Sequence, residues 1–255
     1  MPDPLTLTSL PLFPLNTVLF PGGLLALRVF EVRYLDMVRK CRQTGSPFGV
    51  VTLTAGQEVR SAAAPEERFQ PQGTLAVIEQ LQTPQPGLIT LHCRGTERFH
   101  ITQQHQLPYG LWLADVQQLP DDPQVPLPAD LQSLAAKLGL LLAAQHQRRS
   151  TPGHPIPPTP AQLQDCGWVA NRWCELLPVP LELKHHLMTL DSPLLRLELV
   201  GDAGDVQAGR VLESYLGVFT ERYLQAKHQQ PVDEASSANL RLCELMGTPP
   251  AKRDA

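Results

Sequence analysis

Apolar residues in the first half of the chain fall in short runs that Gly and Pro interrupt, a pattern typical of β-strands. The runs are Leu24–Phe30, Phe48–Leu53, Thr74–Leu81, Leu88–Cys93, Arg98–Ile101 and Leu111–Val116. Residues 83–87 (TPQPG) have the composition of a turn, so the flanking runs predict a hairpin. Strands this short and numerous must close or stack, because unpaired edges invite aggregation. We therefore predict a small, irregular β-barrel.

One helix is expected to interrupt these strands, from Glu31 to Gln43. Its apolar residues recur at helical spacing, at Tyr34, Leu35, Val38 and Cys41. Glu31 stands where the helix dipole favours an anion, and Gly45 follows the other end. We also expect Arg33 to pair with Glu31 across the first turn.

The opening stretch, residues 10–23 (LPLFPLNTVLFPGG), contains three prolines. Proline has no N–H to donate to a β-ladder, so we expect these residues outside interior ladder positions, on a bent and extended course around the barrel.

Beyond Pro120 the apolar period becomes helical. A proline-rich linker over residues 121–128 precedes the first of several apolar stripes, and a second proline-rich break covers residues 151–160. The stripes predict helices at Leu131–Leu142, Leu163–Leu177, Leu181–Leu190, Pro193–Val200 and Val211–Leu224. The pattern thus indicates an α+β protein with a barrel over 1–120, a helical bundle over 121–228, and a disordered or weakly helical tail over 229–255.

Composition narrows the function classes. The 255 residues carry 21 Lys+Arg against 25 Asp+Glu, a formal net charge of -4, which disfavours nucleic acid as the main partner. The N-terminus has no basic residue before its apolar positions, and no apolar run approaches the roughly 20 residues of a membrane helix. The five cysteines never form a C-x-x-C pair, so we expect reduced, mostly buried thiols. We therefore predict a cytoplasmic protein that does not contact membranes.

No catalytic or cofactor motif is present in the sequence. No lysine follows a glycine as in a phosphate-binding loop, and neither G-x-S-x-G nor H-E-x-x-H occurs. His92 and Cys93 are adjacent strand residues and point to opposite faces, which disfavours a metal site with His100. We predict no catalytic residue, no metal and no cofactor.

The run LPLFPLNTVLFPGGLLALRVFEVRYLDMV resembles the opening of the Lon protease N-terminal, substrate-recognition domain. The likeness continues through FGVVTL, QGTLAVIEQLQ, GTERFHI, YGLWLADVQQLPD and LLPVPLELKHHLMTLDSPLLRLELV, about Ser9 to Val200. It implies a PUA-like pseudo-barrel followed by helices, in a bacterial, cytoplasmic protein. It also implies a stand-alone member, since no ATPase or peptidase sequence follows. Departures are Val32, where the family usually has proline, and a longer, proline-rich segment over 143–160.

The resemblance implies a non-enzymatic module that binds exposed hydrophobic segments of unfolded or client proteins. We expect the contact surface near six residues, Phe20, Pro21, Phe30, Arg33, Tyr34 and Trp168, with barrel edge strands adding backbone hydrogen bonds. Three alternatives stay open: RNA binding through the basic residues Arg33, Arg39, Lys40 and Arg42, a small hydrolase, and an adaptor for a separate protease or chaperone. A shared barrel edge or bundle face also allows self-association.

Overall fold

The first half of the chain forms six strands: the predicted apolar runs supply five of them, and residues of the proline-containing opening stretch supply the other. The computed structural model describes residues 5–59, 65–148 and 157–204. The strands are β1 (Thr6–Leu15), β2 (Leu24–Val29), β3 (Phe48–Ala55), β4 (Arg68–Gln85), β5 (Leu88–Gln106) and β6 (Trp112–Gln118). The helices are α1 (Val32–Thr44), the short η1 (Ala129–Leu131), α2 (Gln132–Arg148), α3 (Pro160–Leu163), α4 (Cys166–Leu176), α5 (Leu181–Thr189) and α6 (Pro193–Gly204). The predicted α+β class is therefore confirmed.

The chain divides into two compact units, Met1–Leu194 and Leu195–Ala255. The first unit contains every described strand together with α1–α5. The boundary predicted at residue 120 and the limits predicted for the tail stay predictions. The helix predicted at Val211–Leu224 and the tail predicted over 229–255 lie outside the described residues.

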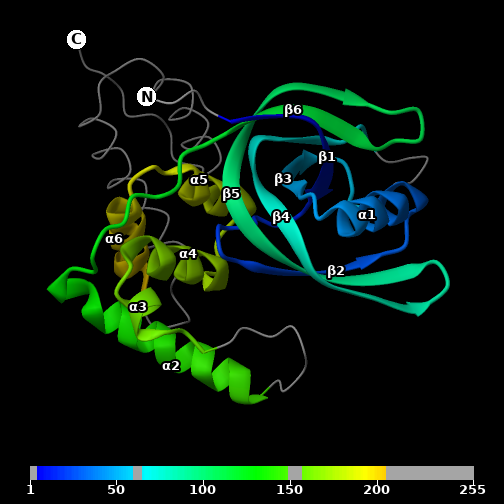
Figure 1. The fold of residues 1–255 in the computed structure, drawn as a ribbon. Coiled ribbons are helices and arrows are strands. Elements are labelled where there is room, and N and C mark those ends of the chain that lie inside the picture. Colours follow the sequence, from blue (N-terminus) through cyan, green and yellow to red (C-terminus); the bar gives the residue numbers. More distant parts are fainter. Residues whose placement is uncertain (1–4, 60–64, 149–156, 205–255) are drawn as a thin grey trace, which may run out of the picture. The chain divides into compact units, whose positions relative to one another are not determined.

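The sheet closes on itself through β5. The strand order is β2-β5-β4-β3-β1-β6, and β5 also pairs with β6, so five strands form a ring to which β2 is added (Figure 1). β5 pairs with β2 through residues 89–94 and with β6 through residues 99–106. The predicted runs Leu88–Cys93 and Arg98–Ile101 are thus halves of one strand with different neighbours. Closure removes most of the exposed edges that would otherwise aggregate.

Two of the early prolines, predicted to lie outside interior ladder positions, are part of a paired strand. Pro11 pairs with Leu113 of β6, and Pro14 pairs with Val51 of β3. β1 lies between these two strands, but its β6 partners end at Leu12 and its β3 partners begin there. Each proline therefore has a ladder partner on one side only, and its missing N–H can face the other side.

Two apolar cores lie on opposite faces of β1 and β3. Phe13 and Val50 belong to the core that includes α1, whereas Leu12 and Val51 belong to the second core. Phe13 stacks on Tyr34 of α1, with ring centroids 4.0 Å apart. Because both faces are covered, these two parallel-paired strands are almost continuously apolar.

Helix α1 begins and ends close to where the sequence predicts. Glu31 is its N-cap residue, and Gly45 follows its C-terminus in the left-handed conformation (φ 71°), which glycine adopts without steric cost. The helix is bonded to two hairpins: Arg42 donates to the Ile78 carbonyl of β4 at 3.2 Å, and Arg33 donates to the Gly110 carbonyl of the β5–β6 turn at 2.8 Å.

The apolar stripe over Leu163–Leu177 forms two helices instead of one, because two polar residues cap separate helix starts. Thr159 accepts a hydrogen bond from the Gln162 N–H at 3.3 Å, and Asp165 accepts one from the Trp168 N–H at 2.6 Å. Each cap satisfies backbone donors that the helix leaves unpaired.

Buried polar side chains join the barrel to α4 and α5. Arg98 of β5, only 5% exposed, donates to the carbonyls of Met188 at 3.1 Å and Leu190 at 3.3 Å. Arg172 of α4 donates to the Pro21 carbonyl at 2.8 Å, and His185 Nε2 of α5 lies 3.1 Å from the Gln72 carbonyl.

Candidate functional site

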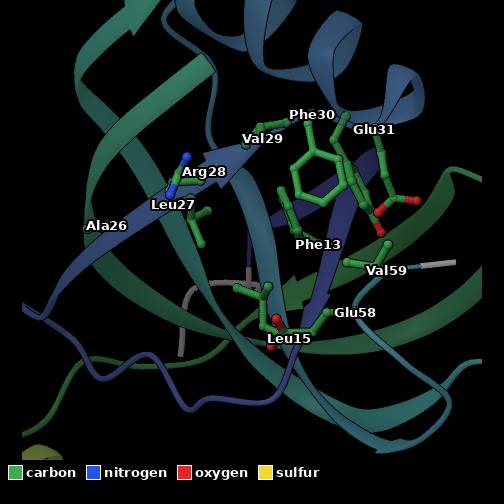
Figure 2. A pocket seen from close by; sticks show the side chains of 11 residues that line it. Phe13, Leu15, Ala26, Leu27, Arg28, Val29, Phe30, Glu31, Glu58 and Val59 are labelled. Atoms are coloured by element: carbon green, nitrogen blue, oxygen red, sulfur yellow. The ribbon is translucent and has the colours of Figure 1, made fainter. Parts of the chain in front are cut away.

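An apolar pocket of about 280 Å³ lies beside β2, and we call it the β2 pocket (Figure 2). Its lining residues come from β1, β2, the β2–α1 corner, the first turn of α1 and the loop after β3: Phe13, Leu15, Ala26, Leu27, Arg28, Val29, Phe30, Glu31, Tyr34, Glu58 and Val59. Carbon atoms form most of the floor, and the charged groups Arg28, Glu31 and Glu58 border it. The pocket is shaped for apolar side chains with polar groups near its rim.

The strand that borders this pocket is an edge strand. Within the described residues β2 pairs with β5 alone, in the register Leu24 with Arg94 to Val29 with Ile89. The other edge of β2 carries no ladder, and residues 26–29 of that strand line the pocket. An incoming extended chain could therefore meet backbone groups and an apolar hollow together.

Exposed apolar side chains continue the pocket onto the surface. Phe30 is 52% exposed and Val59 is 49% exposed, and both line the pocket. Val32, which follows the corner, is 75% exposed. Exposed apolar residues gathered around one hollow are a common mark of an interaction site.

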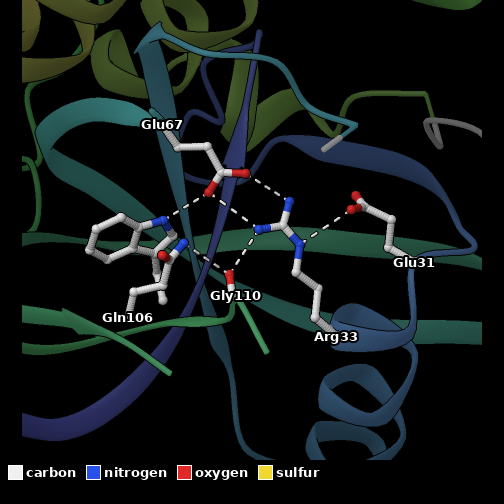
Figure 3. Close-up of polar contacts among 6 residues, drawn as sticks. Glu31, Arg33, Glu67, Gln106 and Gly110 are labelled. Atoms are coloured by element: carbon white, nitrogen blue, oxygen red, sulfur yellow. Dashed lines mark hydrogen bonds and ion pairs between the residues drawn. The ribbon is translucent and has the colours of Figure 1, made fainter. Parts of the chain in front are cut away.

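A buried ion network holds the α1 side of this pocket in place (Figure 3). The Arg33 guanidinium donates to both Glu67 oxygens, at 2.8 and 3.2 Å, and its Nε lies 3.3 Å from Glu31 Oε2. This confirms the predicted pairing with Glu31. Glu67 also accepts a hydrogen bond from Trp112 Nε1 at 2.8 Å. Burial alone would lower the pKa of Arg33, but its hydrogen bonds to Glu67 and the nearby negative charges raise it above its usual value.

A second pocket, of about 250 Å³, lies where β5, the linker and α4 meet. It is lined by Pro21, Gly22, Arg98, Asp121, Asp122, Pro123, Asp165, Gly167, Trp168 and Asn171. Its charged groups already have structural partners, since Arg98 binds two carbonyls and lies 3.4 Å from Asp122, and Asp165 caps α4. More charged and amide side chains line this pocket than line the β2 pocket, and no residue of the edge strand β2 belongs to its lining.

Catalytic and metal chemistry find little support in the described part of the chain. No group of three or more His, Cys, Asp or Glu side chains is placed to hold a metal ion there. Cys41, Cys93, Cys166 and Cys174 are buried thiols outside any disulfide, and burial raises the pKa of Cys93 to about 12. A thiol with so high a pKa is a poor nucleophile at neutral pH.

The sequence model of a family described as the ATP-dependent protease La (LON) substrate-binding domain matches residues 9–203, more than half of the chain. The chain belongs to this family. None of the described helices of this Lon-type domain is long and apolar enough to cross a membrane.

Two solved structures resemble this Lon-type domain. One is the crystal structure of a Lon N-terminal domain protein from Xanthomonas campestris, with 33% identity and a TM-score of 0.58, which aligns over 77% of this chain and 98% of its own. The other is the N-terminal domain of a Mycobacterium avium complex Lon protease, with 19% identity and a TM-score of 0.49, over 76% and 96%. No curated protein matches the chain.

The six residues predicted to form the contact surface of this Lon-type domain do not lie together. Phe20, Arg33 and Tyr34 are 0%, 5% and 2% exposed, so their side chains serve the core and the ion network. Phe30 and Tyr34 line the β2 pocket, whereas Pro21 and Trp168 line the second pocket. Binding of peptides by these residues stays a prediction.

The sequence pattern did not predict that most residues of the β2 pocket belong to a binding site. Leu15, Leu27 and Val59 read as ordinary strand or loop residues, and Glu58 stands in a polar stretch without a motif. The signal that could have found part of the site is the two outward positions of β2, Ala26 and Arg28, which alternate with inward leucines.

Proposed function

We propose that this Lon-type domain binds extended segments of other proteins whose apolar side chains are exposed, as in unfolded or client polypeptides. The observation that carries the proposal is the apolar β2 pocket beside the open edge of β2. A segment lying along β2 would add a strand to the sheet, and alternate side chains would enter the pocket. Backbone hydrogen bonds of this kind give affinity with little sequence preference.

The size of the pocket supports weak, general binding. A cavity of about 150 Å³ accommodates a benzene ring, so about 280 Å³ has room for one or two large apolar side chains. Complete burial of one such side chain contributes about 1.5–3 kcal/mol. Because association itself costs several kcal/mol, a single site of this size supports micromolar or weaker affinity.

The proposal assigns no bond-breaking step to the chain. The matching family is described as a substrate-binding domain, which supports a role in recognition. We also propose a cytoplasmic location, because the four described cysteines are buried thiols outside any disulfide, of the kind that reducing compartments preserve.

Protein is favoured over RNA as the partner because the predicted basic cluster is largely engaged. Arg33 is buried in the ion network, Arg39 pairs with Asp36 at 3.1 Å, and Arg42 donates to a β4 carbonyl. A filter-binding titration with RNA at two salt concentrations tests the alternative. Docking on a separate protease or chaperone, and self-association, stay predictions that pull-down and sedimentation measurements address.

The direct test uses fluorescent, extended apolar peptides that carry a photoreactive side chain. We expect saturable binding and crosslinks to residues 26–31 and 58–59. Phe30→Ser should weaken binding about tenfold, whereas Leu140→Ser, at a 74% exposed position of α2, serves as the matched control and should not. Crosslinks confined to other surfaces would refute the site, and no binding at high micromolar concentration would refute the function.

A further inference from the structure

The rim of the β2 pocket carries charges of opposite sign on opposite sides. Figure 2 shows Arg28 on the β2 side, and Glu31 and Glu58 across the floor from it. Within the described residues, the Arg28 guanidinium makes no ion pair or hydrogen bond. Any segment that occupies the pocket must therefore lie between an unpaired cation and a pair of carboxylates.

Among the described residues, the carboxylate side of the pocket has more carboxylates than cations. Arg33 is shared by Glu31 and Glu67, so one guanidinium faces two carboxylates. Glu58 adds another carboxylate, and no cation within the described residues neutralises it. This side of the pocket therefore attracts positive charge over a short range.

Glu58 is also held in a fixed position. Its Oε1 accepts a hydrogen bond from the Asn16 N–H at 2.5 Å, which orients the carboxylate and leaves Oε2 without a partner among the described residues. The Glu58 side chain is half-buried, whereas Arg28 is exposed on the outward face of β2. A fixed and partly desolvated carboxylate discriminates between ligands more strongly than a mobile, hydrated guanidinium.

We infer that the β2 pocket prefers an extended apolar segment that carries a lysine or arginine on the Glu58 side. The long aliphatic stem of such a residue would pack along Leu15 and Val59, while its charged end reaches the free Glu58 oxygen. Acidic segments would be repelled at the same place. This inference rests on the proposed function, because it specifies the class of segment that the same site takes.

The test compares three short fluorescent peptides that share one alternating apolar core and differ only in their flanks, which carry lysine, serine or glutamate. For the wild-type protein we expect the lysine peptide to bind about threefold more tightly than the serine peptide, and the glutamate peptide to bind weakest, as one ion pair predicts. The preference should shrink as salt rises from about 0.05 to 0.5 M, because screening weakens the charge contribution and leaves the apolar one.

Two substitutions at Glu58 and one control complete the design. Glu58→Gln keeps an acceptor for the Asn16 N–H and should reduce the preference, while Glu58→Lys should reverse the order of the peptides. Glu182→Lys makes the same charge change at an exposed position of α5 and should leave the order unchanged. Circular dichroism of each variant confirms that it is folded.

The outcomes separate the two proposals. Equal affinity for all three peptides, or an order that Glu58→Lys does not alter, overturns the charge preference and leaves the proposed function standing. Absence of binding by all three peptides at high micromolar concentration overturns both.

Discussion

Removing Arg33 alone should destabilise the barrel more than removing both members of the Arg33–Glu67 pair. The two side chains are 4% and 9% exposed, and two hydrogen bonds join them. In Arg33→Met, the Glu67 carboxylate stays buried with the Trp112 indole N–H as its remaining donor. A buried charge left without its partner costs about 3–5 kcal/mol of unfolding free energy.

The opposite single change should cost less. In Glu67→Gln, the new amide oxygen still accepts the Trp112 hydrogen bond, and Arg33 keeps Glu31 at 3.3 Å and the Gly110 carbonyl at 2.8 Å. We expect a loss of about 1–3 kcal/mol. The double variant removes both of the most deeply buried charges; Glu31 loses Arg33 but is 19% exposed and keeps contact with water, and the Gly110 carbonyl still accepts from Gln106 Nε2 at 3.2 Å. Its loss should be only about 1–2 kcal/mol.

The assay is urea unfolding of the four proteins, followed by tryptophan fluorescence and circular dichroism, and analysed as a double-mutant cycle. The expected losses imply a coupling energy of at least about 2 kcal/mol. Additive single effects, or single losses below about 1 kcal/mol, would refute the reasoning that burial makes these charges depend on each other. Because Glu31 and Tyr34 line the β2 pocket, Arg33→Met should also weaken peptide binding.

Three further predictions concern buried groups elsewhere. Burial lowers the pKa of His185 below its usual 6.5, so the unfolded chain takes up this proton at higher pH than the folded one. The contribution of neutral His185 to the free energy of unfolding is complete above pH 6.5 and is lost as the pH falls through the pKa of the folded state. In urea titrations at pH 5 and pH 8, His185→Gln should reduce the difference in unfolding free energy between the two pH values. Cys93, whose pKa burial raises to about 12, should react with a thiol reagent at pH 8 only after unfolding, which absorbance measurements with and without urea would reveal. Gly73→Ala should cost about 1–3 kcal/mol in urea unfolding, because a Cβ there would meet the Val50 carbonyl and approach Phe99 Cζ to 2.7 Å; Gly139→Ala on α2, with only an ordinary contact at 3.4 Å, is the matched control and should not destabilise.

Elements whose ends carry local signals could be predicted from the sequence. Helix α1 was expected at Glu31–Gln43 and runs from Val32 to Thr44, because Gly45 and the apolar spacing act over a few residues. The β4–β5 hairpin was likewise predicted from the turn over residues 83–87. The positions of the two prolines of β1 in the sheet could not be predicted, because a strand tolerates proline only where the neighbouring strand needs no N–H from it, and the sequence does not tell which strand pairs at each position.

The candidate site depends on contacts that no local pattern records. Phe20 and Tyr34 look like binding aromatics in the sequence, yet both are buried, because the fold places other segments over them. Arg33 and Glu67 are 34 residues apart, and their pairing follows from the position of α1 beside the start of β4. The β2 pocket in turn gathers residues from four segments between Phe13 and Val59. Packing between distant segments determines which residues form such a site, and the periodicity of apolar residues does not predict that packing.

The pairing of β1 with β6 also determines when, during synthesis, the barrel can close and its strand edges are no longer available for aggregation. Residues 6–12 find their antiparallel partners only at residues 112–117, so the ribosome must release the whole barrel sequence before the ring can shut. Until β6 has been synthesised, the edge of β1 that pairs with it stays without a partner strand. A polypeptide truncated before Trp112 should therefore accumulate in inclusion bodies or on holdase chaperones, even though it contains nearly all residues of the two barrel cores.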